Sequence, residues 1–539
     1  MTPPASLPQP SRQLPSGAAL LFLLLPLFAP GQTPWATERL DVSIPTRDGK
    51  SLQADLYLPA KAGRYPAVLI QTPYNKKSMG APFATGNGEG PEAGRGAISD
   101  ALAILDRDHY VYAIVDNRGF YKSKPAAEGV KRGTVKQGWD GFDCVEWVAA
   151  QSWCDGKVGT WGGSALGRIQ FETAKERPPH LVCCVPLIAP LDQGYGQYFE
   201  EGILLEGRLQ TLDKLGFDLG ALVRGHRSPE SPLWKIWNRA TDRPDLIEVP
   251  CLLITGWWDE LPGEILRSFE SIVARGGERA RGHSRLLIGP WDHISIGLAK
   301  QGDLAFEAAQ RASATVAKAF LDYWLRGVQN GWEQTSRVRY WQLGEEKWLE
   351  APSWDGLKRI PVNLPLDPSP KSYVCDPRHP APTLGGANLP PLPHGPTVQS
   401  ALDSRTDGLS IPVEVGHALR VNGNPTLRFR FTADRPSCDL IARLCWVRGG
   451  KPYLLSESGK RFAPIRPGEI LQAVLAFPPI AVTGERFKVY LSSASSPRYE
   501  RNPNTGADHW DEAAAGAVTV TVIGGMELSL PTLAETPVK

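Results

Sequence analysis

Short apolar runs recur along the first 290 residues of this 539-residue chain, and stretches with helical periodicity separate several of them. Each run is apolar on both faces, which suits a strand buried between two layers. The apolar runs are 66–70, 110–115, 158–161, 182–188, 251–255 and 286–288, and the helical stretches are 97–106, 141–150, 165–176 and 262–274. Their alternation predicts an α/β fold with a mainly parallel sheet, in which ligands bind at the carboxyl ends of the strands.

Two later regions depart from this alternation, as expected for a chain too long for one hydrophobic core. Between 191 and 248 the strand patterns stop, and 198–212 and 232–237 have the pattern of short helices. From residue 337 onward short alternating segments follow, with Pro-rich text between them; examples are 338–343, 427–431, 440–444 and 487–491. We therefore predict an α/β domain of residues 32–190 and 249–336, a helical cap at 191–248, and a jelly-roll (galactose-binding-like) β-sandwich at 337–539. The segments 40–44 and 52–58 flank an Asp-Gly turn and predict a hairpin.

The first 31 residues have the composition of a secretory signal peptide. Arg12 is the only charge ahead of the apolar run 18–28, and small residues follow it up to Gly31. The run is too short to span a bilayer, so we expect cleavage before Gln32, export to the periplasm or the extracellular space, and no integral membrane segment afterwards.

The charge balance and the cysteines limit the partners that we expect. The chain has 59 basic and 57 acidic side chains and no basic stripe, so we expect no nucleic acid. Its eight cysteines show no CxxC spacing and no clustered histidines, so we expect neither a metal nor a cofactor. Cys144 and Cys154 are the most plausible disulfide pair in an exported protein, whereas Cys183 and Cys184 suit small buried side chains. The oligomeric state stays open.

A serine follows the third apolar run in a glycine-rich turn, Trp161-Gly-Gly-Ser-Ala-Leu-Gly167. Ser164 is either a nucleophile presented at the end of a strand or a small residue of a tight turn, because glycine and serine are common in any such turn. The second glycine stands three residues after the serine, so the strict Gly-x-Ser-x-Gly pattern is not met.

A nucleophilic serine needs a base and an acid that orients it, in the chain order Ser, Asp or Glu, His for an α/β-hydrolase. Asp259 follows one apolar run and His293 follows the next, so both are predicted at the sheet edge where Ser164 emerges. Asp292 is an alternative acid, and Asp259 could instead cap the helix that begins near Pro262.

Several motifs in one order resemble the cocaine esterase and X-Pro dipeptidyl-peptidase family of serine hydrolases, over about Val42 to Gly506. They are Thr72-Pro-Tyr-Asn-Lys76, Val115-Asp-Asn-Arg-Gly119, Gly156-Lys-Val-Gly-Thr-Trp-Gly-Gly-Ser-Ala-Leu-Gly167, Gly256-Trp-Trp-Asp-Glu-Leu-Pro-Gly-Glu-Ile-Leu-Arg-Ser-Phe269, Gly289-Pro-Trp-Asp-His293 and Ser496-Pro-Arg-Tyr-Glu-Arg-Asn-Pro-Asn-Thr-Gly506. The resemblance implies an α/β-hydrolase sheet in which Ser164 is the nucleophile, His293 the base and Asp259 its orienting acid. It also implies an oxyanion hole formed by the Tyr74 hydroxyl and the Ala165 N–H, and a C-terminal domain that helps enclose the site.

The sequence leaves the substrate open. A hydrolase of carboxylic esters or amides is the leading hypothesis, an X-Pro dipeptidyl-peptidase is the alternative, and a carbohydrate- or surface-binding protein with a vestigial triad is the third. Leu166 places no carboxylate beside the serine, which disfavours a substrate ammonium unless the predicted cap supplies one from Asp192, Glu200, Glu201 or Glu206. Relatives often have tyrosine where this chain has Ala165. Trp257, Trp258, Leu261 and the segment 195–199 are predicted pocket walls.

Overall fold

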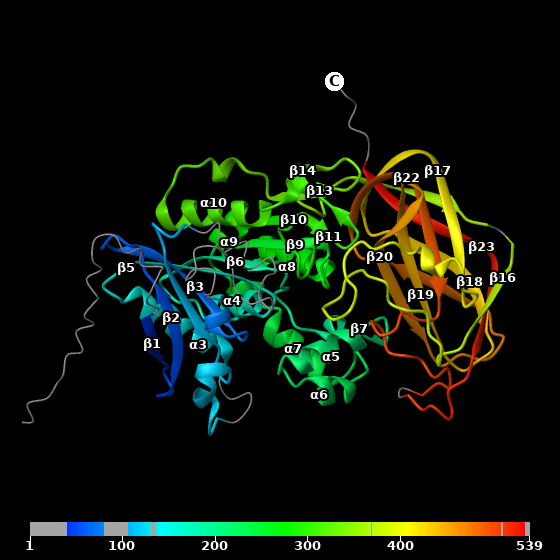
Figure 1. Ribbon diagram of the computed structural model, residues 1–539, viewed down its shortest axis with the longest axis horizontal. Helices are drawn as coiled ribbons and strands as arrows, with labels where there is room; N and C mark the ends of the chain where they lie inside the picture. Colours follow the sequence, from blue (N-terminus) through cyan, green and yellow to red (C-terminus); the bar gives the residue numbers. More distant parts are fainter. Residues whose placement is uncertain (1–39, 80–105, 131–135, 368, 508–509, 534–539) are drawn as a thin grey trace, which may run out of the picture.

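The computed structural model describes residues 40–79, 106–130, 136–367, 369–507 and 510–533. The predicted signal peptide (1–31) and nearly all of the predicted helix at 97–106 lie outside them. Figure 1 shows an α/β domain on one side, an all-β domain on the other, and a small helical cap below the junction between them.

The α/β domain is built on a ten-stranded sheet with the order β1-β2-β4-β3-β5-β6-β9-β10-β13-β14. The strands are β1 (Leu40–Pro45), β2 (Ser51–Tyr57), β3 (Tyr65–Thr72), β4 (Val111–Asp116), β5 (Cys154–Gly163), β6 (Leu181–Leu187), β9 (Leu252–Trp258), β10 (Arg285–Asp292), β13 (Val338–Gln342) and β14 (Lys347–Ala351). Every neighbouring pair from β4 to β13 is parallel, and almost every residue of β3 to β10 is buried. The predicted parallel sheet is thus confirmed, as is the antiparallel hairpin β1–β2.

Helices cover this sheet on both faces: α10 runs along one side in Figure 1, and α3 and α4 lie on the other. The helices are α3 (Gln137–Ala149), α4 (Ala165–Lys175), α8 (Pro262–Arg275), α9 (Glu278–His283) and α10 (Ala312–Arg326), with short 3-10 turns η2 (Tyr121–Ala127), η5 (Glu307–Ala309) and η6 (Trp332–Gln334). Helices α3, α4 and α8 match the predicted stretches 141–150, 165–176 and 262–274 within a few residues. Helices α9 and α10 were not predicted from the sequence. A small hairpin of β11 (Lys300–Gln301) and β12 (Leu304–Ala305) follows β10.

The α/β sheet continues past the predicted boundary at 336/337. The segment 338–343 was expected to open the β-sandwich, but β13 pairs in parallel with β10, and β14 folds back on β13. Helix α10 carries the chain from β10 to β13, which makes the usual crossover between parallel strands. The ten-stranded sheet therefore ends at Ala351.

The cap is helical, as predicted, but it does not begin with a helix. It contains η3 (Tyr195–Gln197), β7 (Phe199–Glu200), β8 (Ile203–Leu204), α5 (Glu206–Lys214), α6 (Gly220–Arg224), α7 (Pro232–Thr241) and η4 (Pro244–Leu246). The first part of the predicted helix at 198–212 is the hairpin β7–β8, whose turn places Glu201 and Gly202 at positive φ. An apolar cluster of its own, with Trp234 against Tyr198, Phe199 and Leu209, holds the cap together.

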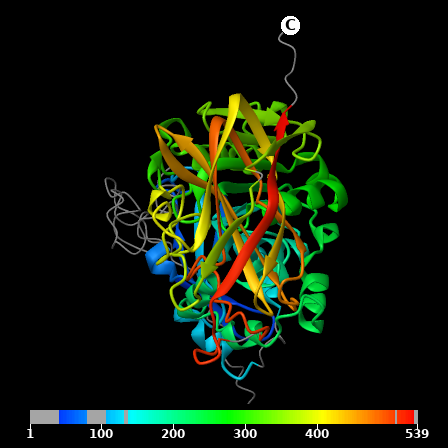
Figure 2. The same ribbon diagram turned by 90° about the vertical axis from the view of Figure 1, so that its right-hand side faces the viewer.

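The C-terminal domain consists of antiparallel strands, and it faces the viewer in Figure 2. They are β15 (Arg359–Pro365), β16 (Lys371–Cys375), β17 (Gly408–Gly423), β18 (Thr426–Ala433), β19 (Cys438–Arg448), β20 (Lys451–Phe462), β21 (Leu471–Ala476), β22 (Ile480–Ser492) and β23 (Val518–Leu533), with the 3-10 turn η7 (Ser400–Leu402). Their main order is β20-β19-β22-β17-β23-β18-β21, and β15 and β16 both pair with β23.

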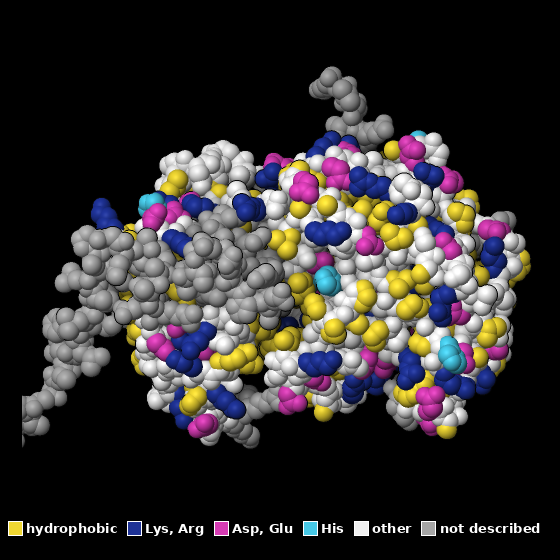
Figure 3. Space-filling view, viewed as in Figure 1, with side chains coloured by type: hydrophobic (Ala, Val, Ile, Leu, Met, Phe, Trp, Pro, Cys, Tyr) yellow, Lys and Arg dark blue, Asp and Glu magenta, His cyan; other side chains and the backbone are white. Residues whose placement is uncertain are grey.

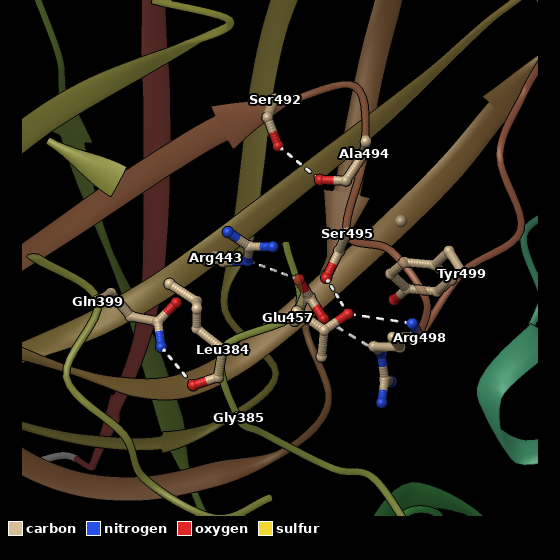
Figure 4. A network of polar contacts seen from close by, with 12 residues as sticks. Leu384, Gly385, Gln399, Arg443, Glu457, Ser492, Ala494, Ser495, Arg498 and Tyr499 are labelled. Carbon is tan, nitrogen blue, oxygen red and sulfur yellow. Dashed lines mark hydrogen bonds and ion pairs between the residues drawn. The ribbon is translucent and has the colours of Figure 1, made fainter. Parts of the chain in front are cut away.

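Buried charges join this domain to the cap. Glu457 of β20 accepts hydrogen bonds from Arg443 (2.7 Å) and pairs with Arg498 (3.1 Å), as Figure 4 shows. Arg498 also lies 3.7 Å from Glu200 of the cap, which accepts a hydrogen bond from the Tyr499 hydroxyl (2.7 Å). Breaking one member of such a buried set is costly because a charge is left without its partner.

The proposed Cys144–Cys154 disulfide is not formed. All eight cysteines are free and buried, with Cys144 inside α3 and Cys154 at the start of β5, where it pairs with Tyr65. Burial raises the pKa of both thiols. Within the described parts of the chain, no helix is both long and apolar enough to cross a membrane. Figure 3 shows basic and acidic side chains interspersed over one face.

Candidate active site

Ser164 stands in the sharp turn between β5 and α4. Its backbone has φ 58° and ψ −121°, a conformation that L-residues rarely adopt and that favours the exposure of its side chain at the strand end. The Ser164 N–H donates to the Leu187 carbonyl of β6 (2.9 Å), and its own carbonyl accepts from the Arg168 N–H (2.9 Å). The strained turn is therefore fixed by the neighbouring strand and by the first turn of α4.

Gly167 lets α4 lie close against the sheet. A Cβ at this position would lie 2.7 Å from the Ala189 Cβ and 2.8 Å from the Leu187 carbonyl oxygen. Gly162 has φ 144°, and a Cβ there would lie 2.6 Å from the Leu166 Cβ. The serine turn therefore depends on the missing side chains of both glycines.

His293 and Asp259 meet beyond the ends of the adjacent parallel strands β10 and β9. The His293 Nδ1–H donates to Asp259 Oδ1 over 2.6 Å. The same Asp259 oxygen also accepts a hydrogen bond from the N–H of the next residue, Glu260 (2.7 Å). The other Asp259 oxygen accepts a hydrogen bond from the Thr255 hydroxyl (2.8 Å). Because Nδ1 carries the proton in this bond, Nε2 is left as the basic atom of the ring.

Asp292 does not compete for this role. One of its oxygens accepts the N–H groups of Ile294 (3.0 Å) and Ser295 (2.7 Å), which shapes the loop after β10. Asp259 does not cap α8 either, because the N-cap residue of this helix is Leu261, whose side chain makes no capping hydrogen bond. Of the two acids left open by the sequence, the geometry selects Asp259.

The pKa of His293 is raised above its ordinary value of 6.5. Burial alone lowers the pKa of this imidazole, but the hydrogen bond and the charge of Asp259 outweigh it, and the charge of Glu260 adds to them. Only 8 % of the His293 side chain is exposed. The ring therefore accepts a proton readily while it stays shielded from bulk water.

Tyr74 follows β3 and reaches the serine turn from the opposite side. Its N–H donates to the Thr72 hydroxyl (2.9 Å), and Asn75 next to it has φ 76°. Burial raises the pKa of the Tyr74 hydroxyl, while hydrogen bonding with the Ser164 side chain and the Ala165 N–H opposes that rise. The two predicted oxyanion donors thus lie next to each other and next to Ser164.

A buried lysine holds the Tyr74 loop in place. Lys76 is fully buried, its N–H donates to Asp116 (2.7 Å), and its ammonium pairs with Asp41 (3.0 Å) and with buried Asp55. Asp55 and Asp116 belong to the neighbouring strands β2 and β4. Nothing in the sequence indicated this anchor except its place two residues after Tyr74.

These residues line one cavity of about 260 Å³ between the sheet edge and the cap. Ser164, Tyr74, Ala165, Asp259 and His293 all lie in its wall. The remaining lining includes apolar side chains from the sheet edge and the cap, among them Ile169, Ile188, Leu212, Phe217, Leu219 and Trp237. All five predicted catalytic and oxyanion residues are brought together.

The structure places the predicted wall residues in two different cavities. Leu261 and Tyr198 line this cavity, but Trp257 and Trp258 do not. They end β9, where the sheet and the C-terminal domain bury them: the Trp257 Nε1–H donates to the Trp341 carbonyl (2.8 Å), and the Trp258 Nε1–H to that of Leu454 (2.9 Å). Both instead border a second cavity of about 530 Å³ at the junction of the three parts, as does Phe199.

Sequence profiles of two families match most of the chain. The profile described as X-Pro dipeptidyl-peptidase (S15 family) matches residues 48–238 and 221–295, and that of the X-Pro dipeptidyl-peptidase C-terminal non-catalytic domain matches 330–527. The cocaine esterase of Rhodococcus sp. (strain MB1 Bresler) is 26% identical over 86% of this chain and 92% of its own length. The chain belongs to the cocaine esterase and X-Pro dipeptidyl-peptidase family. It is thus a serine hydrolase of esters or peptides, in keeping with the resemblance seen in the sequence.

Solved structures share the family fold over nearly the whole chain. An aminopeptidase from a marine sediment archaeon (Thaumarchaeota archaeon) has a TM-score of 0.76 at 19% identity and covers 94% of this chain and 98% of its own. An α-amino acid ester hydrolase has a TM-score of 0.74 at 20% identity, covering 96% and 100%. Both have the α/β-hydrolase and all-β parts in this arrangement.

One feature of this family member was missed by sequence reasoning. Arg208, from cap helix α5, is buried and forms an ion pair with Glu260, the residue after Asp259. Glu260 Oε2 lies 3.9 Å from His293 Nδ1. The cap therefore contributes the cation of a charge pair to the catalytic cavity, and only its position beside Asp259 could have drawn attention to Glu260.

Proposed function

We propose that this protein hydrolyses a carboxylic ester or amide through an acyl-enzyme intermediate, with Ser164 as nucleophile, His293 as base and Asp259 as its orienting acid. The observation that carries the proposal is the 2.6 Å bond from His293 to Asp259 in the cavity that Ser164 and Tyr74 also line. A base oriented by an acid beside a strained serine is the arrangement that acyl transfer requires.

The reaction proceeds in two halves. His293 Nε2 takes the Ser164 hydroxyl proton while Oγ attacks the substrate carbonyl, and the oxyanion formed receives hydrogen bonds from the Tyr74 hydroxyl and the Ala165 N–H, which stands at the start of α4. His293 then protonates the leaving alcohol or amine as its bond to the acyl carbon breaks. Water, deprotonated by His293, attacks the acyl-enzyme, and Ser164 regains the proton when the acid leaves.

The charges of the cavity favour esters and simple amides over peptides with a free N-terminus. Among the described residues that line it, the only carboxylates are Asp259 and Glu260, and each already has a cationic or imidazole partner. The candidates Asp192, Glu200, Glu201 and Glu206 do not line this cavity. A substrate ammonium would therefore find no free acid, which argues against the X-Pro dipeptidyl-peptidase alternative.

A fluorophosphonate probe and a 4-nitrophenyl ester test the proposal together. Ser164→Ala should abolish both labelling and turnover, whereas Ser404→Ala, which changes an exposed serine of the C-terminal domain, should leave both unchanged. Asp259→Asn should reduce kcat far more than Asp292→Asn. Undiminished labelling of the Ser164→Ala protein would remove the basis of the proposal, and faster release from Gly-Pro anilides than from aryl esters would favour the peptidase.

We further propose that the protein acts outside the cytoplasm, on the strength of the signal-like sequence at 1–31. N-terminal sequencing of the protein recovered from the periplasm or the medium should begin at Gln32. Recovery of an uncleaved chain from the cytoplasm alone would contradict this.

A further inference from the structure

Arg168 gives the catalytic cavity a positive charge that none of the described acids neutralises. It lies one helical turn after Ser164 on α4, and it lines the same cavity. Its Nη2 donates to the amide oxygen of Gln197 in the cap (2.8 Å), which is a neutral partner. Over the described part of the chain, Arg168 forms no ion pair with any carboxylate.

The other charges of the cavity are matched in pairs. Arg208 pairs with Glu260, and His293 with Asp259. Arg168 is therefore the one full charge among the described lining residues that lacks a counter-charge. A half-buried guanidinium beside a reaction centre is stabilised by an anion, and an anionic substrate can provide it.

The neighbours of Arg168 indicate which part of the substrate it faces. Arg168 stands in the first turn of α4, shortly after the Ala165 N–H, whereas Asp259 and His293 follow β9 and β10. The leaving group departs toward His293, which protonates it. A substrate held in this way directs its acyl chain toward the α4 side of the cavity, where Arg168 and Ile169 lie.

We propose that the acyl group of the substrate carries a terminal carboxylate and that Arg168 binds it. This rests on the proposed function. The guanidinium fork suits a carboxylate, and the bond to Gln197 fixes one of its nitrogens while the others stay available. The apolar lining and the volume of about 260 Å³ suit a short methylene chain between the carbonyl and that carboxylate. The substrate class is accordingly the monoesters or monoamides of short dicarboxylic acids.

Two substrates that differ in one charge test the proposal. The mono-4-nitrophenyl ester of adipic acid has the free carboxylate, and its methyl ester has the same chain without the charge. We expect wild-type kcat/KM to be higher for the free acid, and the ratio of the two kcat/KM values to fall about ten- to a hundredfold in Arg168→Gln. Arg168→Lys should keep part of the preference, because the charge remains but the fork is lost.

Arg243→Gln is the matched control. It removes the same charge from an exposed cap residue that pairs with Asp245, and it should leave the ratio unchanged. A wild-type protein without preference for the free acid, or an equal loss on both substrates in Arg168→Gln, would overturn the proposal. Neither result would contradict the proposed function, because that is tested separately: Ser164→Ala should lose nitrophenol release from the methylated substrate.

Discussion

Replacing Glu260 by glutamine should extend the activity of this hydrolase to lower pH. His293 must be neutral to accept the Ser164 proton, so the acid limb of kcat/KM follows its pKa, which is raised above 6.5. Glu260 Oε2 stands 3.9 Å from His293 Nδ1. Two unit charges at that separation interact by about 4 kcal/mol at an effective dielectric constant of about 20, or about 3 pH units.

Arg208 weakens the effect of the Glu260 charge on the pKa of His293. Its guanidinium pairs with Glu260 and lowers the pKa of His293, so it offsets part of the attraction in the wild type. Glu260→Gln removes the attraction and leaves the repulsion. We expect the acid midpoint to fall by about one to three units, and the double variant Glu260→Gln/Arg208→Met to recover part of the difference.

The assay is hydrolysis of 4-nitrophenyl butyrate between about pH 5 and 9, followed at the isosbestic wavelength of nitrophenol. Glu230→Gln, which removes an exposed acid of the cap, is the control and should keep the wild-type midpoint. Thermal unfolding at each pH shows whether a loss of activity reflects protonation of His293 or unfolding of the protein. An acid midpoint that stays in place or rises in Glu260→Gln would refute the electrostatic reasoning.

Three further outcomes follow from the structure. Tyr74→Phe should lower kcat about 10²- to 10³-fold with little change in KM, because one oxyanion donor is lost; equal kcat values would remove Tyr74 from the oxyanion hole. Lys76→Met should destabilise the protein by about 3–5 kcal/mol in urea unfolding, because buried Asp55 loses its cation, and an unchanged midpoint would contradict this. The native protein should react only slowly with a thiol reagent and the urea-unfolded protein should titrate eight thiols, since all eight cysteines are buried and free; six would indicate a disulfide.

The parts of the site that the sequence predicted are those that parallel strands bring together. Ser164, Asp259 and His293 each follow a strand of one sheet, and parallel neighbours end at the same edge. Position after a strand is a local property that apolar runs reveal. That Asp259 and His293 lie at the edge where Ser164 emerges therefore followed from order along the chain, without knowledge of distances.

What the sequence did not predict depends on contacts between distant segments. Arg208 reaches Glu260 from the cap, and Trp258 is buried because Leu454 of another domain accepts its N–H. β13 has the alternating pattern of a sandwich strand, yet it completes the α/β sheet because α10 returns the chain to its edge. Periodicity records which residues are buried and not which partner buries them.

The late position of β13 and β14 in the chain sets the order in which the enzyme can assemble during synthesis. One edge of β10 stays without its partner until β13, which ends at Gln342, has been made, and the Trp258 Nε1–H lacks its acceptor until Leu454 has followed. Asp259 adjoins that tryptophan, so this side of the candidate site is completed only after Leu454 of the all-β domain has been made. A nascent chain can thus form the Ser164 turn before the C-terminal domain supports the segment that holds Asp259.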